Sequence, residues 1–250
     1  MVLTRKQIFQ ILCNADLKLK TAILLTSSGG LRISELTQLR YSDINFKSKP
    51  TKILIRTISK NKKPHEVFIT EEATIQLQEY LKKHFGWHKN SLNLDLSGTY
   101  LFGRTSKIKN GDILRFNSNS AKQSMHILLQ NHIKNIPKLS VKNENGRNVI
   151  HFHEFRKYFR TVVSNVCGID YAKALMGYTS YMDTYYQLSN ENKQQNYLSA
   201  EPHLTISEFQ KVEKRYLGLS EKHEQLEKTI SKLKEYLVTN NISIPKIFAD

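Results

Sequence analysis

One change of hydrophobic period constrains the fold of this chain more than any other feature. Residues 51–70 contain two alternating segments rich in β-branched side chains, KILIRTIS and HEVFIT, with the charged, proline-containing KNKKP between them. This pattern predicts one antiparallel β-hairpin with a basic tip. Because most of the remaining chain has helical periodicity, we expect an α+β, mainly α domain with one small antiparallel sheet.

Helix signals lie on both sides of the hairpin. Residues 4–46 predict three helical segments, of which Thr4 and Gln7 can cap the first, and Gly29-Gly30 ends the second, the buried TAILLTSS. After the hairpin, helices are predicted over residues 71–85, about 118–136, 153–166 and 171–176.

The C-terminal tail follows a different pattern. Apolar or ring-bearing residues recur at alternating spacings of three and four over about four heptads, which predicts a coiled-coil helix for contact between protomers. The alternative is a single helix that folds back on its own domain. We therefore expect two parts, residues 1–206 and 207–250. The repeating positions are Phe209, Val212, Tyr216, Leu219, His223, Leu226, Ile230, Leu233 and Leu237.

The chain is strongly basic. It has 38 lysine and arginine residues against 22 acidic ones, a formal net charge of +16. Such an excess favours a polyanionic partner, most often nucleic acid, although proteins from some organisms are basic throughout.

The sequence disfavours a membrane protein and a metal-binding protein. No apolar run approaches the roughly 20 residues of a spanning helix, and the charged start MVLTRKQIFQ does not resemble a signal peptide. Cys13 and Cys167 lack metal-ligand spacing. We expect an intracellular, cytoplasmic protein associated with DNA, with no membrane partner and no metal.

Residues suited to phosphodiester chemistry are spread along the chain. His153 and Arg156 lie three positions apart, so on a helix they share one face. Arg32 lies upstream in GGLRISEL, and Tyr185-Tyr186 lie downstream. Arginines clamp a phosphodiester, histidine transfers protons, and tyrosine supplies an oxygen nucleophile that needs no metal.

Three segments, taken in order, identify a family. SSGGLRISELTQLRYSDIN, HEFRKYF and LMGYTSYMDTYYQLS, with the hairpin after the first, resemble the catalytic domain of tyrosine recombinases, the phage integrase family. The resemblance is closest to integrases of archaeal mobile elements and covers about Leu3 to Ile206. It implies the tyrosine recombinase catalytic fold for residues 1–206, without the N-terminal core-binding domain that family members usually carry.

The resemblance also implies a reaction. A tyrosine hydroxyl attacks the scissile phosphate, expels a 5′ hydroxyl and leaves a 3′-phosphotyrosyl bond, without metal, ATP or another cofactor. By analogy, Arg32 and Arg156 stabilise the charge on the phosphate, and His153 exchanges protons near the nucleophile. Lys60 matches the hairpin lysine that protonates the leaving oxygen. Glu35 matches an acidic residue that orients Arg32, although as a solvated helix residue it would have no such role.

Two departures from the family pattern concern the third segment. Tyr178 stands where the family usually has histidine or tryptophan, and its phenol can donate the same hydrogen bond to phosphate. The stretch from Gly177 to the tyrosine pair is one residue short. We prefer Tyr185 to Tyr186 as the nucleophile, because a gap in the turn is easier to absorb than one in the following helix.

The implied partners are double-stranded DNA and further copies of the chain, as a dimer or tetramer on DNA. Two alternatives remain: a truncated integrase that binds DNA and modulates a full-length enzyme, and a type IB topoisomerase-like enzyme. Basic residues in and before the hairpin are candidate DNA contacts, or else a solvated surface: Lys47, Lys49, Lys52, Arg56, Lys62 and Lys63.

Overall fold

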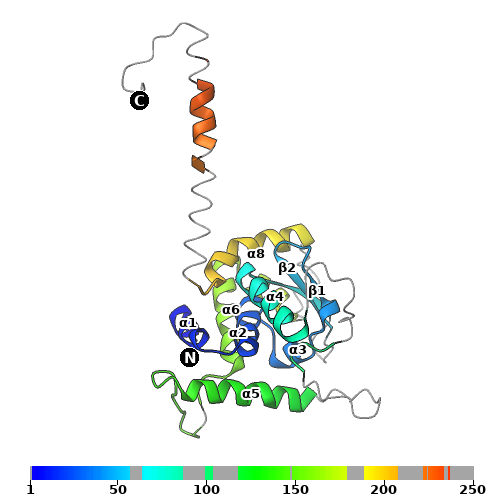
Figure 1. Ribbon diagram of the computed structural model, residues 1–250, viewed down its shortest axis with the longest axis vertical. Coiled ribbons are helices and arrows are strands. Elements are labelled where there is room, and N and C mark those ends of the chain that lie inside the picture. Colours follow the sequence, from blue (N-terminus) through cyan, green and yellow to red (C-terminus); the bar gives the residue numbers. More distant parts are fainter. Residues whose placement is uncertain are drawn as a thin grey trace. The chain divides into compact units, whose positions relative to one another are not determined.

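The computed structural model divides the chain into two compact units, Met1–Ile206 and Ser207–Asp250. Helices surround a small sheet in the first unit (Figure 1). The structure describes residues 2–56, 64–86, 99–103, 118–146, 148–178, 189–207, 222–223, 225–233 and 236.

Helix α2 (Leu17–Gly29) is the centre of the first unit. It is buried on all its faces and packs against α4, α6 and β3, as expected for a helix that is apolar all round. The preceding helix α1 (Arg5–Cys13) begins with the predicted capping box, in which the Thr4 backbone N–H donates to Gln7 Oε1 at 2.9 Å. Gly30 ends α2 in the left-handed conformation, with φ of 64°.

The sheet is antiparallel and has three strands in the order β1-β2-β3. The predicted hairpin is confirmed as β2 (Thr51–Ile55) paired with β3 (His65–Ile69), with Ile53 opposite Val67. A third strand, β1 (Ile44–Asn45), pairs with β2 and was not predicted, because two residues are too short to give a periodic signal. Alternate residues of β2 are buried, so one face of the sheet packs on the core.

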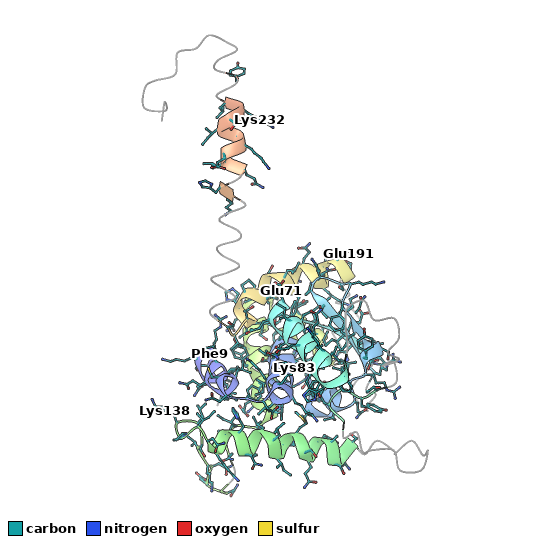
Figure 2. The ribbon with its side chains drawn as sticks, in the orientation of Figure 1. Phe9, Glu71, Lys83, Lys138, Glu191 and Lys232 are labelled. Carbon is teal, nitrogen blue, oxygen red and sulfur yellow. The ribbon has the colours of Figure 1, made fainter. Side chains whose placement is uncertain are left out.

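Further helices come before and after the hairpin in the chain. Helix α3 (Ile33–Thr37) follows α2 and leads into a 3₁₀ turn, Tyr41–Asp43. Helix α4 (Glu71–Phe85) has the predicted bounds, with acidic residues in its first turn and basic residues in its last, as the helix dipole favours. Figure 2 shows Glu71 and Lys83 near opposite ends of α4. Helix α5 is Ser118–Lys134.

Helices α6 (Phe152–Cys167), α7 (Ile169–Leu175) and α8 (Asn190–Leu204) close the first unit. Gly168, with φ of 89°, separates α6 from α7, as its predicted role at the end of α6 requires. Helix α8 is fixed by Tyr197, which is fully buried and donates its hydroxyl to Ser28 O at 2.8 Å. Figure 1 shows α8 and α5 at opposite ends of this unit.

The second unit is described only in part. Residues 225–233 are helical, and Leu226, Ile230 and Leu233 on this helix are exposed. The coiled coil therefore stays a prediction, because most of its positions lie outside the described residues. Among the helices in the described ranges, none is both long enough and apolar enough to cross a membrane.

Candidate active site

The turn between α2 and α3 positions Arg32. The left-handed Gly30 reverses the chain direction after α2, and Arg32 then immediately precedes the first residue of α3. The Arg32 backbone N–H donates to Glu35 Oε2 at 2.7 Å, which satisfies one of the amides at the start of the helix. Arg32 is thus fixed by its backbone, while its side chain remains partly exposed.

Arg156 lies in the second turn of α6 and is almost fully buried, with 2% of its surface exposed. Its guanidinium donates to Gly30 O and, at 3.4 Å, to Met176 O. Burial lowers the pKa of Arg156, and the charge of Glu35 opposes that shift. Nε of Arg156 is buried and has no hydrogen-bond partner among the described residues.

Glu35 contacts both arginines, the backbone of Arg32 and the side chain of Arg156. Its side chain is buried, so the alternative of a solvated helix residue is wrong. Glu35 Oε2 accepts the Arg32 backbone N–H and lies 3.7 Å from Arg156 Nη1. The carboxylate therefore faces the Arg156 guanidinium and supplies the countercharge that this buried cation requires.

Tyr178 brings the two arginines to a common point. Its ring centroid lies 5.7 Å from Arg32 Cζ and 5.6 Å from Arg156 Cζ. Burial raises the pKa of the Tyr178 phenol, but hydrogen bonds from Arg156 and Arg32, together with their charges, outweigh burial and set this pKa below its ordinary value. The phenol oxygen therefore lies where two guanidinium groups stabilise negative charge.

His153 shares a cavity of about 300 Å³ with Arg32 and Arg156. Partial burial and the charge of Lys157 lower the pKa of His153, while the Glu154 charge opposes this shift. This shift favours the neutral imidazole, which is able to accept a proton.

Two further histidines line the same cavity and were missed by the sequence reasoning. His126 comes from α5, and nothing in its helical context distinguishes it from an ordinary surface residue. His151 is the N-cap residue of α6 and lies just outside the helix in extended backbone.

A comparison with family models accounts for this arrangement. The model described as "Phage integrase family" matches residues 2–193. The chain belongs to this family. The matched range of this phage integrase family member contains Arg32, His153, Arg156 and Tyr178, the four residues that the folded first unit brings together.

Solved structures similar to this family member have low sequence identity to it. The XerA recombinase has 20% identity and a TM-score of 0.49, with 79% of this chain and 62% of that chain covered. The Tn1549 transposon integrase in complex with circular intermediate DNA has 19% identity and a TM-score of 0.49, with 79% of this chain and 64% of that chain covered. A lambda integrase dimer bound to a COC′ core site has 13% identity and a TM-score of 0.48, with 76% of this chain and 62% of that chain covered.

The chain thus spans less than two thirds of the length of each of these solved chains. No curated protein matches the sequence.

Some predicted site residues are not described. Lys60, Lys62 and Lys63 at the hairpin tip, and Tyr185 and Tyr186, lie outside the described residues. Their positions and roles stay predictions.

The remaining basic residues of the sheet region differ in their surroundings. Lys47 and Lys49 are exposed. Lys52 pairs with Glu66 at 3.0 Å, and Arg56 pairs with the buried Asp43. These two cations therefore already have acidic partners within the sheet region, and any phosphate contact by them adds to or replaces those pairs.

Gly177 sets the position of Tyr178 in this phage integrase fold. Its φ is 70°, and a Cβ at this residue would overlap the His65 imidazole at the start of β3. Gly177→Ala is expected to lower the free energy of unfolding by about 2 kcal/mol, because the left-handed backbone is strained and the imidazole must move.

Gly146→Ala is the matched control for Gly177→Ala. Gly146 also has φ of 70° but has no atom near its would-be Cβ, so it isolates the backbone cost of about 1 kcal/mol. Denaturant unfolding of both variants measures the difference. Equal losses would show that His65 does not pack against this turn.

Proposed function

We propose that this chain cleaves and rejoins DNA strands as a tyrosine-type site-specific recombinase. Membership of the phage integrase family supports this proposal. The observation that carries it is the convergence of Arg32 and Arg156, from different elements, on one phenol oxygen of Tyr178. Guanidinium pairs of this kind suit the two non-bridging oxygens that share the negative charge of a phosphodiester.

In the proposed reaction, the scissile phosphate lies between the two guanidinium groups, beside or in place of the Tyr178 phenol. The unpaired Nε–H of Arg156 is then a donor that a phosphate oxygen can satisfy. Each fixed donor that meets developing negative charge contributes about 3–4 kcal/mol of transition-state stabilisation. Glu35 keeps Arg156 in place for this role.

The bond changes assign a role to each proposed residue. The Tyr185 hydroxyl loses its proton to His153 and attacks phosphorus, and the bond from phosphorus to the 5′ oxygen breaks. Lys60 protonates that leaving oxygen. The phosphotyrosyl bond retains the energy of the phosphodiester, so a 5′ hydroxyl of another strand can reverse the step.

A nicked suicide substrate tests the proposal. When cleavage releases a short 5′-hydroxyl fragment that diffuses away, rejoining stops and the protein–DNA adduct accumulates. We expect a covalent adduct that Tyr185→Phe abolishes and Tyr186→Phe leaves intact. An adduct that forms on Tyr186 would change the nucleophile, whereas DNA binding without any adduct would favour a non-catalytic modulator.

We also propose that the second unit joins protomers. Leu226, Ile230 and Leu233 form an exposed apolar stripe at helical spacings of four and three, as in a coiled-coil seam. Leu226→Asp is expected to lower the molar mass measured by sedimentation, while Lys232→Ala, off the stripe, leaves it unchanged. A chain that is monomeric before mutation would contradict this assembly.

A further inference from the structure

The cavity at Arg32 and Arg156 contains more imidazole groups than the proposed reaction uses. His126 from α5, His151 at the start of α6, and His153 in the first turn of α6 all line it. The reaction needs one proton acceptor, and His153 supplies it. His126 and His151 therefore have no role in strand cleavage as described above.

Two of the three rings lie close together, and the third contacts Phe152, which lies between them in the sequence. The centroids of the His151 and His153 rings lie 6.2 Å apart. The ring of His126 makes an edge contact with Phe152, with centroids 5.9 Å apart. Within the described part of the chain, no group of three potential ligands is arranged to hold a metal ion.

Burial and nearby positive charges favour the neutral forms of the His126 and His153 imidazoles. Burial and the nearby His151 lower the pKa of His126, while Arg156 and Lys157 disfavour a further positive charge on His153. The carboxylate of Glu154 opposes these effects and lies 3.5 Å from His151 Nε2 and 2.9 Å from Lys157 Nζ.

Arg32, in the turn before α3, adds a further cation to the lining of the cavity. A bound phosphate would supply negative charge and so reverse this balance, because an anion next to an imidazole favours its protonated form.

We propose that His126 and His151 bind a second backbone phosphate of the DNA strand, adjacent to the phosphate held by Arg32 and Arg156, and take up protons on binding. This inference rests on the proposed function, because it places the cleaved strand in the cavity. Histidine suits such a subsite better than lysine. It adds charge only when the strand is present and therefore avoids permanent repulsion of the two arginines.

Proton uptake measured by calorimetry tests the subsite. A chain carrying both Tyr185→Phe and Tyr186→Phe is titrated with a short duplex DNA in buffers of different ionisation enthalpy. We expect net proton uptake near pH 7, and binding that tightens as the pH falls, by at most about tenfold per pH unit for each proton taken up. His126→Gln and His151→Gln should each reduce both quantities.

His203→Gln is the matched control, since His203 is exposed on α8 and does not line the cavity. It should leave proton uptake unchanged. If His126→Gln does not fold, His151→Gln alone decides, because its half-exposed side chain makes few packing contacts.

The outcomes separate the two proposals. Equal uptake by the parent chain and both variants would overturn the histidine subsite and leave the recombinase proposal intact. Loss of proton uptake in a His153→Gln variant alone would also overturn the histidine subsite and leave the recombinase proposal intact. A chain that binds no DNA would overturn both.

Discussion

Arg156→Lys is expected to slow strand cleavage by about 10²–10³-fold in a single turnover, which corresponds to the loss of one fixed donor to a developing oxyanion. A lysine ammonium has its three donors on a single nitrogen, whereas the planar guanidinium has five donors spread over three nitrogens and can meet Gly30 O, Met176 O and a phosphate oxygen together. The measurement is the rate of covalent adduct formation on a nicked substrate.

Arg160→Lys provides the matched control for this substitution. Arg160 lies one turn further along α6 and is exposed, so its replacement should leave the rate unchanged. Both variants keep the charge, and any difference between them therefore reports geometry and hydrogen bonding rather than net charge. A wild-type cleavage rate in Arg156→Lys would contradict the role proposed for the buried guanidinium.

Gly30→Ala is expected to lower the free energy of unfolding by about 4 kcal/mol. Gly30 has φ of 64°, which strains any residue with a Cβ, and that Cβ would overlap the ring of Phe159 in the core. Relief of this overlap must move α6 relative to α2, and this movement would also displace Arg156 from Gly30 O. Cleavage activity should fall together with stability.

Gly86→Ala separates the cost of backbone strain from the cost of overlap with a neighbouring side chain. Gly86 ends α4 with the same φ of 64°, but nothing lies within 4 Å of its would-be Cβ. It should therefore show only the backbone cost, about 1 kcal/mol. Equal losses of stability in the two variants, measured by denaturant unfolding, would mean that close packing at Gly30 does not limit the choice of residue.

Local signals were sufficient to predict most of the helical framework. The Thr4–Gln7 capping box, the apolar run of α2 and the glycine after α6 act within a few residues, so the sequence displays them directly. The same holds for β2 and β3, whose alternation matches the burial of β2. The family resemblance then supplied the order of the three site segments, and the family match to residues 2–193 confirms that identification.

Contacts between distant segments were not predictable in the same way. Burial of Glu35 against Arg156 depends on how α3 packs near α6, and a helix residue of this type is solvated in most contexts. His126 reaches the cavity only because α5 crosses the start of α6. Tyr178 was predicted as a phosphate donor, but its present hydrogen bonds from both arginines follow from the turn at Gly177.

The most direct test of the central claim is the position of the scissile phosphate in a DNA complex of the chain carrying Tyr185→Phe and Tyr186→Phe. The account predicts that Arg32 and Arg156 both lie within hydrogen-bonding distance of non-bridging oxygens of one phosphate. It also predicts that the Tyr178 phenol no longer bridges the two guanidinium groups. A complex in which these two arginines contact different phosphates, or in which Tyr178 still joins them and DNA lies elsewhere, would contradict the account.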